Sequence, residues 1–265
     1  MVDTNAIYVL WLRDIKRFIR AKSRIIGMLV LPIFFLLGLG LGLGNLIPSS
    51  VLGGSYLEFI VPGIIGMSLI FTSVASGTSV LWDRQFGFLK EILVTPNSRS
   101  SVVIGRVAGG ATTAMLQSFI IVIISLLIGF NIHFTAATIL AIAFMFLIAT
   151  TFISLGLIFG SMINDFQGFQ LVTSFVTMPL FFLSNGIFPL SALPGFVKYI
   201  AYLNPLSYGV DGLRITLSGA TSFLNPIHLG WLVISPLAID LLLMLISSAI
   251  MIAIASYAFN RTDVG

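Results

Sequence analysis

Six long apolar stretches, separated by short polar connections, constrain this chain more than any other feature of its sequence. A segment that crosses a bilayer must satisfy its own backbone hydrogen bonds, so it is either a helix or part of a closed barrel. Runs of about 20 apolar residues fit a helical span, whereas barrel strands alternate over about ten residues. We therefore predict an all-α integral membrane fold. Its six transmembrane helices are expected at residues 25–44, 57–81, 103–130, 136–163, 166–188 and 231–259.

The composition excludes a soluble domain. Charged residues make up 8% of the chain and its mean hydropathy is +1.11, whereas an average soluble domain has about 25% charged residues. The net charge of +4 comes from basic residues beside the apolar stretches, which indicates membrane topology and not a nucleic-acid partner. The chain has no cysteine, so disulfides and thiolate metal sites are excluded.

Residues 5–24 have the pattern of an amphipathic helix. The apolar positions recur at helical spacing and are Ile7, Leu10, Trp11, Ile15, Phe18 and Ile19. Charged residues, mostly basic, occupy the other face. This pattern predicts an interfacial helix that lies on the membrane lipids. The alternative is a plain basic flank of the first span.

The distribution of basic residues predicts the orientation. With the N-terminus inside and six spans, eleven of the 13 lysines and arginines fall on the inner side, and only Lys198 and Arg214 fall outside. Lysine and arginine bias sets the orientation of membrane proteins. We therefore expect both termini in the cytoplasm, and the plasma (inner) membrane of a bacterium or archaeon as the location.

A polar turn at residues 83–106 interrupts the apolar pattern between the second and third spans. It is too charged to lie in lipid and too apolar for a plain solvated loop. We predict that residues 84–101 contain a short amphipathic helix, at about 86–95, that docks on another protein, followed by a break at 96–101 that restarts the third span. The residues expected to make this contact are Phe88, Leu89, Glu91, Ile92, Leu93, Pro96 and Arg99. The alternative is that its apolar residues lie on the lipid surface.

Residues 189–230 are broken by prolines and glycines. Two short amphipathic pieces, 196–203 and 206–217, lie between the breaks, and neither is long enough to span a bilayer. We predict a re-entrant helical hairpin in the outer leaflet. Irregular backbone at that depth must be buried in protein or line a wet cavity.

The sequence lacks the motifs of several catalytic classes. No lysine follows a glycine, so the chain has no phosphate-binding loop of the Gly-Lys type. The two histidines, His133 and His228, fall in outer loops that are far apart in the sequence. We therefore expect no catalytic residue, no bound metal and no enzyme activity in this chain.

Two acidic residues fall within or beside predicted spans. An ionisable residue inside a membrane segment is costly and is often functional. Asp240 is expected either to pair with Lys198 or Arg214, or to form a proton or substrate site. Glu58, near the outer end of the second span, is open to the same two interpretations.

Two local sequences resemble a known family of membrane proteins. Residues 84–99, RQFGFLKEILVTPNSR, are similar to the cytoplasmic coupling segment of the ABC-2 type permeases. Residues 204–214, NPLSYGVDGLR, resemble the motif that precedes the last span in that family, with Asn204, Pro205, Tyr208, Asp211 and Arg214 as its marked positions. The resemblance also includes the six spans and covers essentially the whole chain.

The resemblance implies a half-transporter. Two copies would form the pathway, and two separate ABC ATPase subunits would bind ATP and Mg and drive export, so this chain would bind no cofactor itself. The spans near the dimer axis would line a path for a lipophilic or amphipathic substrate, such as a drug, a lipid or a lipid-linked glycan. The expected lining residues are Phe71, Thr72, Phe175, Thr177 and Phe181.

Two other functions remain open. One is an autonomous ion-coupled secondary transporter that relies on Asp240. The other is a membrane scaffold or assembly factor that transports nothing. Recruitment of an ATPase distinguishes the exporter from both.

Overall fold

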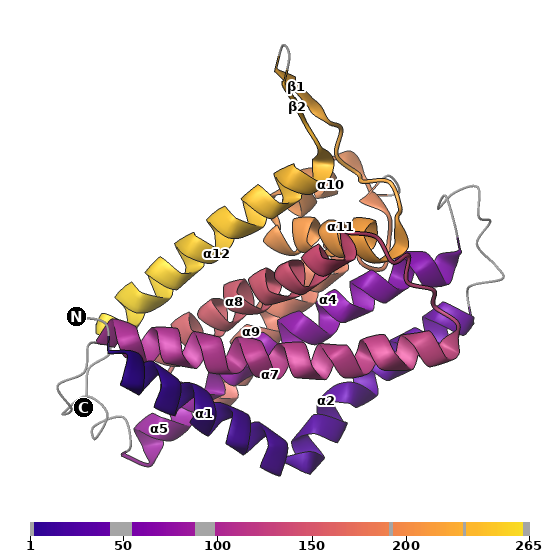
Figure 1. The fold of residues 1–265 in the computed structure, drawn as a ribbon. Coiled ribbons are helices and arrows are strands. Elements are labelled where there is room, and N and C mark those ends of the chain that lie inside the picture. The colour runs from indigo at the N-terminus through magenta and orange to yellow at the C-terminus, as the bar shows by residue number, and fades with distance from the viewer. Residues whose placement is uncertain (1–2, 43–54, 88–98, 191–192, 230–231, 262–265) are drawn as a thin grey trace.

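The computed structural model describes residues 3–42, 55–87, 99–190, 193–229 and 232–261. It is a helical bundle with one small hairpin (Figure 1). Its elements are α1 (Thr4–Arg20), α2 (Lys22–Phe35), the π-helical η1 (Leu36–Leu41), α4 (Tyr56–Ser76), α5 (Thr78–Gln85), α7 (Arg99–Ile128), α8 (Thr138–Met162), α9 (Phe166–Phe182), α10 (Gly195–Leu203), α11 (Pro205–Ser218), β1 (Ile227–Leu229), β2 (Leu232–Ile234) and α12 (Pro236–Asn260).

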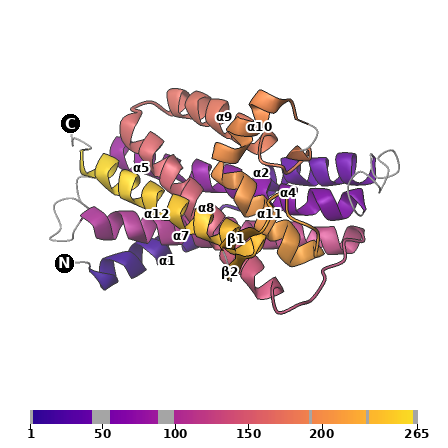
Figure 2. The same cartoon turned by 90° about the horizontal axis from the view of Figure 1, so that it is seen from above.

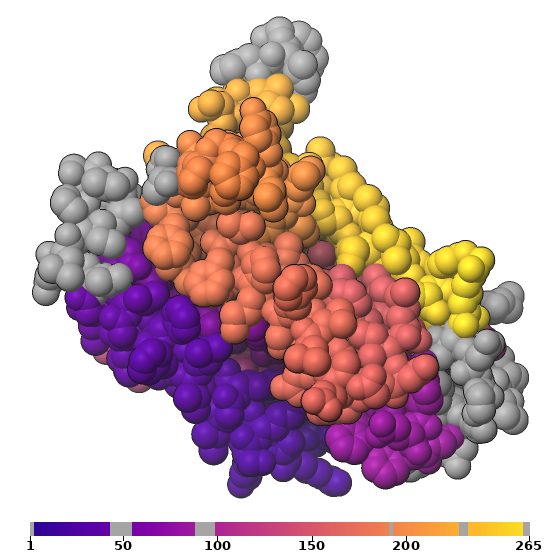
Figure 3. All heavy atoms as spheres, turned by 180° about the vertical axis from the view of Figure 1, so that it is seen from behind, coloured from indigo at the N-terminus to yellow at the C-terminus, as the bar shows by residue number. Residues whose placement is uncertain are grey.

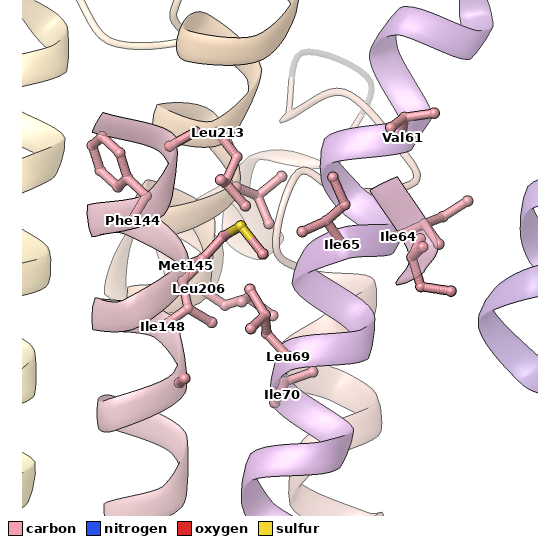
Figure 4. Packing of buried hydrophobic residues seen from close by; sticks show 14 of the residues in the cluster. Val61, Ile64, Ile65, Leu69, Ile70, Phe144, Met145, Ile148, Leu206 and Leu213 are labelled. Atoms are coloured by element: carbon pink, nitrogen blue, oxygen red, sulfur yellow. The ribbon is translucent and has the colours of Figure 1, made fainter. Parts of the chain in front are cut away.

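The helices α4 and α8 form the centre of the bundle. α7 and α11 pack against both of them, and α12 packs along α8 (Figures 1 and 2). Figure 4 shows this core, where Ile65 and Leu69 of α4 face Met145 and Ile148 of α8, with Leu206 of α11 beside them. Lipid tails are as apolar as these side chains, so close packing, and not escape from water, holds such helices together.

Five helices are long and apolar enough to cross a membrane. They cover Lys22–Leu41, Tyr56–Gln85, Arg99–Ile128, Thr138–Met162 and Pro236–Asn260. α9 is also apolar, but it has only 17 residues. The all-helical membrane fold predicted from the sequence is therefore present, with five candidate spans in the described residues where six were expected.

Burial separates central from peripheral spans. Over the most apolar window of 18 residues in each helix, 83% of the residues are buried for Tyr56–Gln85 and 72% for Thr138–Met162. The share is 17% for Lys22–Leu41 and 17% for Pro236–Asn260. The peripheral helices instead expose large apolar side chains, such as Ile26, Val30 and Phe34 on α2. These exposed faces are available for lipid or for another protein chain.

Glycines allow the central helices to approach closely. A Cβ added at Gly77, between α4 and α5, would lie 2.1 Å from the carbonyl oxygen of Gly156 on α8. One added at Gly160 would lie 2.5 Å from the carbonyl oxygen of Gly77. The four-residue spacing of Gly156 and Gly160 therefore serves packing within one chain, as such spacing does in other membrane helices.

α1 lies alongside α7. The backbone N–H of Asp3 donates to Ser101 Oγ at 2.8 Å, and Trp11 Nε1 donates to Thr112 Oγ1 at 3.1 Å. Asp3 also caps the helix, because its side chain accepts from the N–H groups of Asn5 and Ala6. The charged segment at the N-terminus is therefore held on the bundle by contacts at two points.

Several element boundaries differ from those expected. α1 ends at Arg20, and the next helix begins at Lys22, so the first span starts earlier than residue 25. The last span starts later than residue 231, because β1 and β2 form an antiparallel hairpin just before it. Ser235 then caps α12 and Pro236 takes its first position, where a proline is well tolerated.

Candidate functional site

A buried ion cluster joins three helices at the end of the bundle where the described chain stops at Gly87 and resumes at Arg99. Arg106 Nη2 on α7 lies 2.5 Å from Asp83 Oδ2 on α5, and Arg13 Nη2 on α1 lies 3.1 Å from the same oxygen. Arg106 Nη1 also donates to Ser79 Oγ at 3.1 Å. We call Arg13, Asp14, Ser79, Asp83 and Arg106 the Asp83 cluster.

Arg106 is buried although it lies near the end of a span. Arginine side chains at such positions commonly reach the lipid headgroups. The Arg106 side chain is instead only 1% exposed, because Asp83 and Ser79 provide partners inside the protein. A buried charge is tolerated when it is paired and hydrogen-bonded in this way.

Asp14 lies at the edge of the same cluster. Its carboxylate is 3.5 Å from Arg13 Nη2, and its side chain is 15% exposed. Burial raises the pKa of Asp14 above its ordinary value of 3.8, although the positive charges of Arg13 and Arg106 act in the opposite direction. The attachment of α1 therefore includes an acid that is costly to ionise.

Arg84 connects α5 to the turn between α8 and α9. Its Nη1 donates to Asn164 Oδ1 at 2.5 Å and its Nη2 donates to the carbonyl of Ser161 at 2.9 Å. Asp165 in the same turn caps α9 by accepting from the N–H of Gly168. The end of α5 is thus joined to α1 and α7 through Asp83, and to α8 and α9 through Arg84.

Most of the predicted docking residues lie outside the described part of the chain. These are Phe88, Leu89, Glu91, Ile92, Leu93 and Pro96. Arg99 is described, as the first residue of α7, and its Nη1 donates to the carbonyl of Asn260 at 2.6 Å. Segment 88–98 therefore follows α5 and precedes α7 in the sequence. The salt bridge between Asp83 and Arg106 connects the same two helices.

Two neighbouring cavities lie near the Asp83 cluster. The smaller, about 290 Å³, lies among α1, α2, α4, α5 and α7, and the larger, about 460 Å³, lies among α2, α4, α5 and α9. Arg24, Met28, Thr78 and Trp82 line both of them. The space-filling view shows the face on which α2, in indigo, and α9, in salmon, flank the larger cavity (Figure 3).

The predicted pathway residues separate into three groups. Phe71 and Thr177 line the larger cavity, and Thr72 lines the smaller one. Phe181 is 1% exposed and packs edge-on against the Phe71 ring at 6.1 Å between centroids. Phe175 is 82% exposed on α9 and is not part of either lining.

The opposite end of the bundle is closed by contacts around Arg214 on α11. Arg214 Nη2 donates to the carbonyl oxygens of Asn185, at 2.5 Å, and Phe59, at 3.3 Å. Its guanidinium carbon lies 3.9 Å from the centroid of the Phe59 ring, a cation–π arrangement. Asn185 has a φ of 60°, a left-handed conformation that asparagine tolerates better than most residues.

The rest of the predicted outer motif builds α11. Asn204 Oδ1 accepts from the N–H of Leu206 at 3.0 Å and so caps the helix, and its Nδ2 donates to the carbonyl of Leu180 at 2.6 Å. Pro205 takes the first helical position, and the Tyr208 hydroxyl donates to the carbonyl of Tyr202 at 2.5 Å. These contacts position α11 against α9 and α10.

The structure gives Asp240 a different neighbour from those expected. The predicted partners were Lys198 and Arg214, but the described contacts place the carboxyl of Asp211 within hydrogen-bonding reach of Asp240. Arg214 Nη1 lies 3.9 Å from Asp211 Oδ1, so Arg214 pairs with Asp211 instead. Glu58 has a structural role, because its side chain and that of Ser55 form the capping box of α4.

Sequence reasoning missed the Asp83 cluster and the bonds of Arg84. The available signal was an acid, Asp83, and a base, Arg106, at opposite ends of one polar turn, because antiparallel helices bring such positions together. Nothing in the sequence indicated that Arg13 of the N-terminal helix would reach the same acid. The role of Asn185 could not be predicted either. Its carbonyl accepts from Arg214 of α11, a helix that begins 20 residues later in the sequence.

Comparison with known proteins adds evidence on identity. The sequence profile of the ABC-2 type transporter family matches residues 5–218. The chain is 30% identical over 224 residues to the inner membrane transport permease YadH of Escherichia coli strain K12, covering 81% of this chain and 83% of that protein. It is 29% identical over 216 residues to nodulation protein J of Rhizobium leguminosarum bv. viciae, covering 81% and 82%.

Proposed function

This chain belongs to the ABC-2 type transporter family, and from that premise we propose that it is the permease subunit of an ATP-driven exporter in which two copies form the pathway. It is a membrane transport permease and not itself an enzyme, and membership of the family implies an ATPase partner. In this proposal two ATPase subunits bind ATP and Mg, and the substrate is lipophilic or amphipathic.

The observation that carries the proposal is the connection of segment 88–98 to the bundle. The segment leaves α5 and enters α7, and both helices meet in the Asp83 cluster. A displacement of the segment therefore reaches α1 through Arg13 and α9 through Arg84 and Asn164. This arrangement suits a region where force from an ATPase enters, and it supports Phe88, Leu89, Glu91, Ile92 and Leu93 as docking residues.

We assign the Asp83 cluster to the cytoplasmic side. This orientation follows the bias of lysine and arginine, eleven against two, which is the general determinant of topology. It makes α9 a sixth, short span, makes α10 and α11 the re-entrant outer elements, and places α1 at the inner lipid interface. The residues around Arg214 then form the outer closure of the pathway.

The two cavities support the proposed path. Asp14 and Ser79 of the Asp83 cluster line the smaller cavity, and the larger cavity combines aromatic residues with the hydroxyls of Thr173, Ser174 and Thr177. Apolar walls with a few polar groups are typical of small-molecule sites. Arg24 at both cavities favours substrates with an acidic or polar head, and the exposed apolar face of α2 is where we place the second copy.

Co-expression with the neighbouring genes tests the proposal. An ATPase should co-purify with this chain, and Glu91→Ala or Leu93→Asp should weaken its binding or its stimulation by substrate. Phe134→Asp is the matched control, because Phe134 is an exposed apolar residue in the connection between α7 and α8, outside both helices. Full ATPase binding and full transport in both segment variants would remove the role of residues 84–101.

ATP dependence separates this function from the ion-coupled carrier. Transport into proteoliposomes should require ATP and the ATPase, and it should not run on a pH gradient alone. Transport by the isolated chain along a proton gradient, lost in Asp240→Asn, would favour the carrier. A chain that recruits no ATPase and moves no substrate would favour a scaffold.

A further inference from the structure

Two carboxyl groups meet inside the protein where α11 packs against α12. Asp211 and Asp240 are each 0% exposed and lie within hydrogen-bonding reach of each other. Among the described residues, no N–H or hydroxyl group donates to either oxygen of Asp240. Asp211 Oδ2 accepts from the Ser222 hydroxyl, and Asp211 Oδ1 accepts no hydrogen bond.

The surrounding charges do not balance two carboxylates. Arg214 is the nearest positive group, at 3.9 Å from Asp211, and its hydrogen bonds go to the carbonyls of Asn185 and Phe59. The segments 138–162, 219–226 and 236–260 contain no charged residue other than Asp240. Lys198 on α10 and Glu58 on α4 are the other charged residues on elements that pack against α11, and neither forms an ion pair with the two acids.

We propose that Asp211 and Asp240 form a proton-binding site in which one proton, held between the two carboxyl groups, joins α11 to α12. Two carboxyl groups that share a buried site repel each other strongly when both are ionised. One proton removes that repulsion and supplies the missing donor, because a protonated carboxyl has an O–H and a carboxylate only accepts. Arg214 then balances the single remaining negative charge.

This proton stabilises more than one contact. α11 carries Arg214, which holds Asn185 and Phe59, so the position of α11 determines the closure at this end of the bundle. Loss of the proton would leave two adjacent carboxylates and would push α12 away from α11. Burial raises the pKa of Tyr208 on α11, and the charge of Asp240 raises it further, so Tyr208 adds no negative charge at neutral pH.

The proposal gives a definite sign for the effect of pH. The folded chain holds a proton that the unfolded chain releases at neutral pH. Stability therefore falls as pH rises through the range where the pair loses that proton. The loop at residues 219–226 precedes the hairpin, and its partly exposed Ser222 donates to Asp211 Oδ2.

Infrared spectroscopy of the full chain in lipid nanodiscs tests the site directly. We expect a protonated carboxylic acid band at neutral pH that shifts in deuterium oxide and is lost in Asp240→Asn, since the remaining Asp211 then ionises beside Arg214. Asp165→Asn is the matched control, because that acid is exposed and should leave the band unchanged.

The unmodified chain alone can overturn the proposal. If it has no protonated carboxyl band at neutral pH, the pair does not hold a proton, whatever the variants do. Thermal unfolding gives a second measurement: the melting temperature of the unmodified chain should fall towards alkaline pH, and that of Asp240→Asn should fall less, because an amide donates at every pH. Equal slopes in both chains would also overturn it. Neither outcome depends on whether the chain is an exporter.

Discussion

Arg106 on α7 and Asp83 on α5 form a salt bridge of 2.5 Å whose side chains are 1% and 2% exposed. The two residues flank segment 88–98, which lies between their helices in the sequence. Their bond therefore fixes how the two ends of that segment sit relative to each other. Arg13 adds α1 to the same contact, with a more exposed side chain at 3.1 Å.

Removing one partner of this bridge should destabilise the protein strongly. Arg106→Met leaves Asp83 buried with Arg13 as its one basic partner among the described residues, and breaking a buried pair in this way costs about 3–5 kcal/mol. Adding Asp83→Leu to that variant should restore most of the loss, because no unpaired charge remains. Denaturant unfolding of the four chains measures the coupling. An Arg106→Met chain as stable as the original would show that the bridge contributes nothing.

Asp14 should make the attachment of α1 sensitive to pH. Burial raises its pKa above 3.8, so the folded chain binds its proton more tightly than the unfolded chain does. Stability is then greatest at low pH and falls as pH rises through the interval above 3.8. Asp14→Asn should remove this part of the pH dependence and raise the melting temperature at neutral pH. A lower melting temperature at neutral pH would mean that the pairing with Arg13 outweighs the burial.

Gly63 should not tolerate a side chain. A Cβ at this position would lie 2.1 Å from the carbonyl oxygen of Gly186, which is backbone and has little room to move. Gly63→Ala should therefore lower stability by about 1–3 kcal/mol or more, the usual cost of overpacking. Gly27→Ala on α2 is the control, because nothing lies within 4 Å of its added Cβ. Equal unfolding midpoints for the two variants would contradict the close approach of the two backbones.

The membrane fold was predictable because helices in a bilayer must be long and apolar, and both properties are visible in the sequence. The shortness of α9 was harder to see, since its apolar pattern continues past Phe182 where the helix ends. The hairpin at 227–234 was missed because its residues are as apolar as the span that follows. Hydropathy alone does not distinguish a short apolar strand from the first turns of an apolar helix.

The sites were less predictable because they depend on contacts between distant residues. Asp240 was correctly singled out as an unusual acid inside a span, but its neighbour is Asp211, another acid, and not one of the basic residues considered. Sequence reasoning favours opposite charges as partners, whereas a pair of acids that shares a proton has no comparable signal. Phe175 and Phe181 look alike in the sequence, yet the turn of α9 exposes one and buries the other.

Filling the larger cavity should block transport without preventing assembly. Ser174 lines the cavity, and Phe175, the next residue, is 82% exposed outside it. Ser174→Trp places a large ring where a substrate would lie, and each loss of about 1.4 kcal/mol in the free energy of substrate binding lowers the affinity roughly tenfold. Phe175→Trp adds similar bulk on the outer face, so transport should stay close to that of the original chain. ATP-dependent uptake of a lipophilic fluorescent dye into inverted vesicles measures both, with co-purified ATPase as the check on assembly. A larger loss in Phe175→Trp than in Ser174→Trp would move the pathway from the cavity to the exposed face of α9, where a second copy of the chain would complete it.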